Sequence, residues 1–73
     1  MSSTYLTERR FDDAAQDVAQ AARWLRKGVR REDPVAMAIA EEWLETALAK
    51  WEQARDEHSR ALEEAAARRG ATP

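Results

Sequence analysis

The sequence contains no cysteine, and only two glycines and two prolines occur in its 73 residues. Without cysteine, neither a disulfide framework nor a thiolate metal site can compensate for a small core. No apolar run approaches the roughly 18 residues that would cross a bilayer, and no basic segment followed by an apolar one marks a secretion signal. The composition excludes a β-rich fold. We therefore expect a small all-α protein that is cytoplasmic and does not associate with membranes.

Bulky apolar residues are also scarce, because Val, Ile, Leu and Phe together fill ten positions whereas alanine fills sixteen. In a chain of 8.3 kDa this leaves little core and approaches the composition of disordered proteins. A net charge of only −2 and the few glycines and prolines argue against disorder. The composition therefore predicts a single helical domain over residues 1–73 that needs a partner, and it argues against a self-contained enzyme.

The first helix is predicted over residues 8–27. Thr7 is a suitable N-cap, and Gly28 can adopt the left-handed conformation that follows a helix end. Residues 1–6 are then expected to form a flexible end. Because a single glycine costs only about 1 kcal/mol inside a helix, an extension to about residue 31 is the alternative.

The second helix is predicted over residues 34–69, and its start signal is stronger. Asp33 is a good N-cap acceptor, and it stands directly before Pro34, the residue best tolerated at the first helical position. No glycine or proline follows until Gly70, which is a candidate for the residue after the helix. Residues 71–73 are expected to form a second flexible end.

Both predicted helices carry an uncharged apolar stripe when residues are placed at 100° steps. The first stripe contains Phe11, Ala14, Ala15, Val18, Ala21, Ala22 and Leu25. The second contains Ala36, Met37, Ala40, Trp43, Leu44, Ala47, Leu48, Trp51 and Ala54, and it continues more weakly through His58, Ala61, Leu62, Ala65 and Ala66. Because the connection is short, the helices should form an antiparallel hairpin of the coiled-coil type.

A hairpin has a single layer of contact, and these stripes are wider than one helix neighbour can cover. Trp24 and Trp43 also look outward from the seam. We expect a second copy to cover the surplus and form a homodimeric four-helix bundle, since two-fold dimers are the commonest oligomers. A monomeric hairpin completed by a different protein is the alternative. The residues predicted for self-association or partner binding are Trp24, Trp43, Leu44, Leu48, Trp51 and Leu62.

Two further regions of the second helix remain to be explained. The shorter first helix should reach only to about residue 54, which would leave Arg55 to Arg69 without an intramolecular neighbour. Val35 and Ile39 fall on the opposite face near the turn, where they could pack under the loop or form a second partner patch.

A basic cluster precedes the turn and contains Arg23, Arg26, Lys27, Arg30 and Arg31. Cations are favoured at a helix C-terminus, which explains the cluster without a ligand. The same side chains could instead contact phosphates, and this is the basis of an alternative function as a nucleic-acid-associated accessory protein.

Catalytic and metal chemistry find little support in the sequence. His58 is the only histidine and has no partners at metal-ligand spacing, so no metal site or cofactor is expected. The acidic groups fall on outward faces as solvated surface; they are Asp12, Asp13, Asp17, Glu41, Glu42 and Glu45. We therefore expect a non-enzymatic helical interaction protein that self-associates and binds another macromolecule as an adaptor, inhibitor or regulator.

Overall fold

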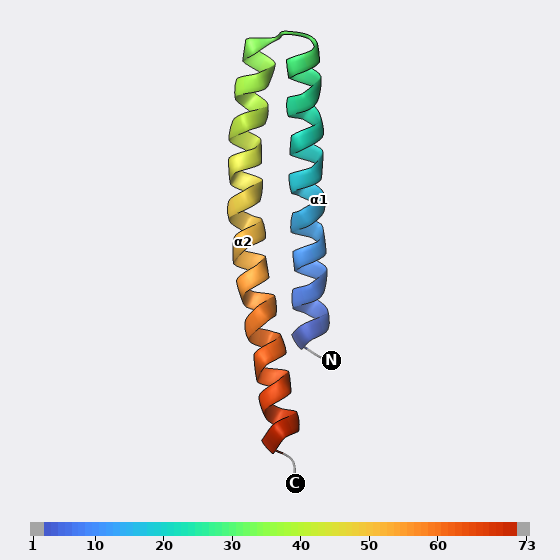
Figure 1. Cartoon of the computed structure of the whole chain (residues 1–73), viewed down its shortest axis with the longest axis vertical. Coiled ribbons are helices and arrows are strands. Elements are labelled where there is room, and N and C mark those ends of the chain that lie inside the picture. Colours follow the sequence, from blue (N-terminus) through green and yellow to red (C-terminus); the bar gives the residue numbers. More distant parts are fainter. Residues whose placement is uncertain (1–2, 72–73) are drawn as a thin grey trace.

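The computed structural model describes residues 3–71 and consists of two antiparallel helices, with no strand among those residues (Figure 1). Helix α1 spans Ser3–Arg30 and helix α2 spans Pro34–Ala71. The predicted all-α hairpin is confirmed. It is a rod with extents of 62 × 15 × 15 Å, with the turn at one end and α2 extending past the start of α1 at the other.

Helix α1 is longer at both ends than the predicted range 8–27, and its end at Arg30 agrees with the alternative extension to about residue 31. It begins at Ser3 rather than at residue 8, so Thr7 is not an N-cap and lies inside the helix. The Thr7 hydroxyl donates to the carbonyl oxygen of Thr4 at 3.1 Å and lies 2.9 Å from His58 Nδ1. Of the ends predicted to be flexible, residues 3–6 and residue 71 are helical, and residues 1, 2, 72 and 73 lie outside the described part.

At the end of α1, the residue in the left-handed conformation is not the one that the sequence predicts. Glu32 has a φ of 53°, whereas no described glycine has a positive φ, so Gly28 is not the terminating residue. The Asp33 N–H donates to the Gly28 carbonyl at 3.1 Å, and the Glu32 N–H donates to the Val29 carbonyl at 3.1 Å. These are the two bonds of a Schellman ending, with Glu32 in the position that glycine usually occupies.

The start of α2 follows the prediction. Asp33 is its N-cap, because its Oδ1 accepts the Ala36 N–H at 3.2 Å and its carbonyl accepts the Met37 N–H at 3.0 Å. The other end runs past the predicted boundary, because α2 continues through Gly70 to Ala71. The connection between the helices is thus short and held by hydrogen bonds on both sides.

Gly28 is needed for packing rather than for chain reversal. A Cβ atom at this position would lie 3.1 Å from Met37 Cγ and 3.2 Å from the Met37 backbone nitrogen. Both distances are shorter than ordinary van der Waals contact. The two helices therefore approach each other closely beside the turn, where an added methyl group would press against Met37.

The core is a row of small residues repeated at seven-residue intervals, which is the spacing of a coiled-coil seam. Every buried residue between 4 and 70 belongs to this row. Its members are Ala14, Ala21 and Gly28 of α1 and Ala40, Ala47, Ala54 and Ala61 of α2. Small side chains in one seam position allow the two backbones to approach closely.

The other seam position carries bulky side chains that one neighbouring helix covers only in part. The half-buried members are Phe11, Val18 and Leu25 of α1 and Met37, Leu44, Trp51 and His58 of α2. The ring of Phe11 lies 5.5 Å from that of Trp51 and 6.0 Å from that of His58. No side chain larger than alanine is buried between residues 4 and 70.

Helix α1 accompanies α2 further than predicted. Arg10 pairs with Glu57 at 3.8 Å, Thr7 contacts His58, and Ala61 is buried. The expectation that Arg55 to Arg69 lacks an intramolecular neighbour is therefore wrong for the first half of that segment. The reason is the earlier start of α1, whose five additional residues lengthen it by about 7.5 Å.

Candidate protein-interaction surfaces

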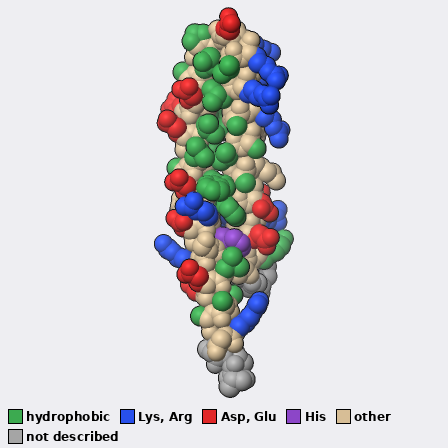
Figure 2. Space-filling model, in the orientation of Figure 1, with side chains coloured by type: hydrophobic (Ala, Val, Ile, Leu, Met, Phe, Trp, Pro, Cys, Tyr) green, Lys and Arg blue, Asp and Glu red, His purple; other side chains and the backbone are tan. Residues whose placement is uncertain are grey.

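The two seam rows give the hairpin two different sides. We call the bulky side the apolar stripe and define it as Phe11, Val18, Leu25, Met37, Leu44, Leu48 and Trp51. Figure 2 shows apolar side chains gathered along the junction of the helices, with the single histidine at the end of the dense part. Acidic side chains border this stripe along α2, and basic side chains border it along α1 near the turn.

The residues predicted as one interface do not lie together. Leu44, Leu48 and Trp51 belong to the apolar stripe, and Leu48 is 40% exposed. Leu62 is also exposed and lies four residues after His58, on the continuation of the same helix face. Trp24 and Trp43 are elsewhere, because they line a pocket that none of the stripe residues line. The predicted interface is thus divided between two sides of the hairpin.

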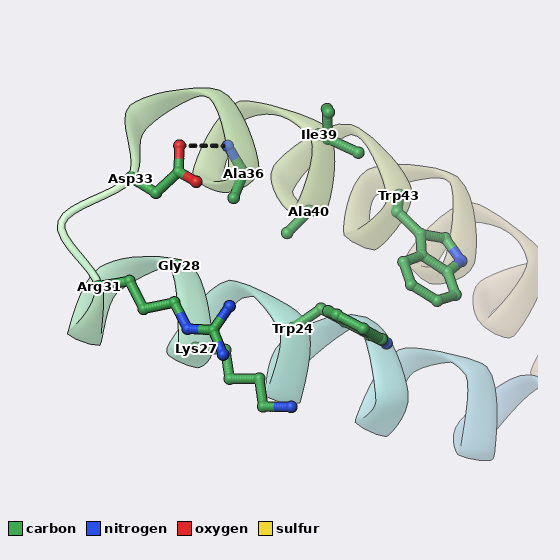
Figure 3. A pocket seen from close by; sticks show the side chains of 9 residues that line it. All are labelled: Trp24, Lys27, Gly28, Arg31, Asp33, Ala36, Ile39, Ala40 and Trp43. Carbon is green, nitrogen blue, oxygen red and sulfur yellow. Dashed lines mark hydrogen bonds between the residues drawn. The ribbon is translucent and has the colours of Figure 1, made fainter.

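The second side is hollowed beside the turn. Trp24 and Trp43 face each other across the seam with ring centroids 6.5 Å apart and planes inclined by 37° (Figure 3). Between this pair and the turn lies a depression of about 340 Å³, which we call the turn pocket. It is lined by Trp24, Lys27, Gly28, Arg31, Asp33, Ala36, Ile39, Ala40 and Trp43.

Further from the turn, the same side is polar. A second depression contains Ala14 and Ala54 of the small row and is otherwise lined by polar or charged side chains: Arg10, Asp13, Asp17, Lys50, Gln53 and Glu57. Acidic and basic side chains both occur there. Arg10 of α1 forms an ion pair with Glu57 of α2, with an N–O distance of 3.8 Å. The polar lining of this second depression thus contrasts with the apolar floor and walls of the turn pocket.

The predicted basic cluster remains exposed as a group. None of its five members forms an ion pair in the described part of the chain. Lys27 and Arg31 line the turn pocket, and Lys27 Nζ lies 5.2 Å from the centroid of the Trp24 ring. Arg23, Arg26 and Arg30 do not line it.

The pair predicted as a second partner patch is also divided. Val35 is 67% exposed and Ile39 is 63% exposed, but only Ile39 lines the turn pocket, where it accompanies Trp43. The spacing of four residues between Ile39 and Trp43 was a usable signal for this arrangement. The alanine and glycine residues that form the pocket floor carried no functional signal in the sequence.

The acidic residues considered for catalysis all have exposed side chains. Within residues 3–71, no group of three or more His, Cys, Asp or Glu side chains is arranged to hold a metal ion. His58 instead contacts Thr7 and the Phe11 ring, and so belongs to the packing between the helices.

Comparison with protein families, with curated proteins and with solved structures finds no match to this chain. Among the described residues, neither helix contains a stretch long and apolar enough to cross a lipid bilayer. The two sides of the hairpin are therefore the observations from which a function can be argued.

Proposed function

We propose that this chain is a non-enzymatic helical interaction protein, which forms a homodimer through the apolar stripe and binds a further macromolecule as an adaptor, inhibitor or regulator. The observation that carries this proposal is the exposure of the stripe beside a core made only of alanine and glycine. Complete burial of one Leu, Phe or Val side chain contributes about 1.5–3 kcal/mol. In a single hairpin the stripe side chains are only partly buried, so they contribute only part of that stabilisation.

A homodimer interface of standard size needs only a small part of the hairpin surface. A standard interface buries about 800 Å² on each partner, roughly one eighth of the 5981 Å² that this hairpin exposes. Stacking two hairpins stripe against stripe converts two half-covered layers into the core of a four-helix bundle. This arrangement is a closed two-fold dimer, which exposes no further copy of the same surface.

Charge at the edges of the stripe also favours self-association. Arg26 follows the stripe residue Leu25 on α1, and Glu45 follows Leu44 on α2. If the two turns lie at the same end, α1 of one copy crosses α2 of the other and brings Arg26 toward Glu45. If the turns lie at opposite ends, α1 crosses α1 and α2 crosses α2, which brings the two acidic borders of the α2 helices together. Charge therefore favours the arrangement with both turns at the same end.

A single spin label distinguishes the two orientations. Because the chain lacks cysteine, Val35→Cys provides one exposed attachment site beside the turn. If the two stripes overlap, the dimer axis passes near Val18, the middle of the stripe on α1, which lies about 18 Å from the end of that helix. Turns at opposite ends should therefore give a label separation of about 36 Å or more, and turns at the same end should give about 20 Å, the width of two helices. Pulsed electron paramagnetic resonance measures this distance.

Light scattering behind a sizing column tests the dimer itself. The wild type should have twice the chain mass of 8.3 kDa. Leu48→Glu should be monomeric, because a charge buried in an apolar interface without a partner is strongly unfavourable. Ala49→Glu is the matched control, since the neighbouring residue points away from the stripe and should leave the dimer intact. A cooperatively folded wild-type monomer at micromolar concentration would contradict the proposal.

A second candidate function rests on the basic cluster, whose five cations lack ion-pair partners within the described residues. These side chains could contact phosphates of a nucleic acid, and dimerisation would double the cluster. Such binding should weaken steeply with added salt and should be lost in the double variant Arg26→Ala with Arg30→Ala. Trp43→Ala should leave it intact. Weak salt dependence, or loss in Trp43→Ala, would favour a protein partner instead.

A further inference from the structure

The turn pocket has a floor and walls of different chemistry. Gly28, Ala36 and Ala40 contribute the small residues at its base, where α1 lies close to the backbone of α2. Trp24 and Trp43 close it on the side away from the turn. Because the floor lacks long side chains, a third helix lying along the groove can approach both α1 and α2 closely.

The charge of the pocket rim is concentrated on one helix. Lys27 and Arg31 stand on the α1 side, and neither forms an ion pair in the described part of the chain. Asp33 is the only carboxylate that lines the pocket, and its Oδ1 is engaged by the Ala36 N–H (Figure 3). On the α2 side the rim is apolar, because it is formed by Ile39. The pocket therefore suits a ligand with an acidic flank and an apolar flank.

We propose that the turn pocket binds an amphipathic helix of another protein, whose bulky apolar side chains contact Trp43 and Ile39 and whose carboxylates face Lys27 and Arg31. The inference rests on the proposed role in binding a macromolecule and identifies the site and class of that partner. Trp24 and Arg31 are seven residues apart, a separation of about 10 Å or two helical turns. The partner therefore needs apolar residues one turn apart with acidic residues beside them.

This site is separate from the surface proposed for self-association. No residue of the apolar stripe lines the turn pocket, and the pocket includes residues of the small row, which the stripe lacks. A dimer formed through the stripe would carry two accessible turn pockets. Partner binding and dimerisation should thus respond to different substitutions.

The test uses three synthetic peptides of about 14 residues, roughly four helical turns, and the full chain. All three share leucines one turn apart, and their flank carries glutamate, glutamine or lysine, residues of similar helix propensity. Fluorescence anisotropy of labelled peptides measures binding. The glutamate peptide should bind saturably, the glutamine peptide about tenfold more weakly, and the lysine peptide not detectably. Absence of saturable binding by the glutamate peptide, or equal binding of the glutamate and lysine peptides, overturns the proposal.

Two matched variants locate the binding site. Ile39→Glu should lower the affinity for the glutamate peptide at least about tenfold, because it adds a negative charge to the apolar rim and repels the peptide's carboxylates. Val35→Glu, at nearly the same exposure one turn away but outside the pocket, should leave affinity unchanged. Both residues are exposed, so neither variant removes a core contact. Equal effects of the two variants overturn the proposed site.

Two further variants separate this inference from the other proposals. Lys27→Gln with Arg31→Gln should reduce affinity for the glutamate peptide to that for the glutamine peptide. Leu48→Glu should abolish the dimer and leave peptide affinity unchanged. Loss of peptide binding in Leu48→Glu would place the peptide on the stripe and overturn the inference. A monomeric wild type that still binds the glutamate peptide would instead contradict self-association alone.

Discussion

The apolar stripe and the opposite side of the hairpin are built from the same two helices with the same seven-residue repeat, yet they differ in side-chain size. On the stripe, residues such as Phe11, Leu44 and Trp51 are half-buried, whereas the alanines of the small row are covered almost completely. Two helices can enclose a small side chain between their backbones, but a large one always reaches past the single contact layer. The hairpin thus separates residues that fix its own geometry from residues available to another chain.

This comparison implies that close approach depends on the small row. Ala21 has no exposed surface. Replacing it with leucine should force the helices apart and lower the free energy of unfolding by about 2–3 kcal/mol, the usual cost of overpacking. Ala22→Leu places the same side chain beside the stripe, where the native residue is exposed, and should change stability by less than about 0.5 kcal/mol. Urea denaturation followed by circular dichroism measures both, and equal losses would show that the two sides are not distinct.

A smaller effect is expected at Gly28, the member of the small row beside the turn. Gly28→Ala should gain about 1 kcal/mol of helix propensity but lose more through contact with the Met37 backbone, for a net loss of about 1 kcal/mol. The Met37 N–H is fixed by its bond to the Asp33 carbonyl, so it cannot move freely. Gly70→Ala is the control, because nothing lies within 4 Å of its added methyl group. Thermal unfolding should show a lower midpoint for the first variant and not for the second.

The smallest effect concerns the hydrogen bond between Thr7 and His58, which joins the two rows. Thr7 continues the small row by its spacing, and its hydroxyl lies 2.9 Å from Nδ1 of His58 in the bulky row. Thr7→Val should lower stability by about 1 kcal/mol or less, since it leaves a half-buried ring nitrogen without this partner. Thr46→Val removes an exposed hydroxyl that is hydrogen-bonded within its own helix. Its free energy of unfolding should stay within about 0.5 kcal/mol of the wild-type value. A larger loss in Thr46→Val than in Thr7→Val would contradict this role of the cross-helix bond.

Local sequence signals were enough to predict the hairpin. The Asp33 and Pro34 pair located the start of α2 because capping depends on adjacent residues alone. The ends of α1 were predicted less well, since tertiary contacts decide them. Gly28 is equally compatible with a left-handed cap and with a close helix contact, and only the position of Met37 distinguishes the two. The contact of Thr7 with His58, in turn, joins residues 51 positions apart.

The sequence also contains the pattern that separates the small row from the bulky row, but placing residues at 100° steps does not distinguish the two rows. That projection placed Ala14 and Phe11 in one stripe, although they occupy different positions of the seven-residue repeat. Spacing Ala14, Ala21 and Gly28 by seven would have revealed the small row. The turn pocket could not have been predicted in the same way, because the facing of Trp24 and Trp43 depends on the register between the helices.

Pro34 has a consequence for how two copies can assemble. In many short-linked hairpins, straightening the turn yields one uninterrupted helix, and two such rods can exchange halves in a domain-swapped dimer. Here the proline ring would clash with the carbonyl of Arg30 in a continuous helix, and the missing N–H would break the helical hydrogen-bond ladder, at a cost of about 3 kcal/mol. Residue 34 therefore opposes exchange of helices between copies and favours association of two closed hairpins.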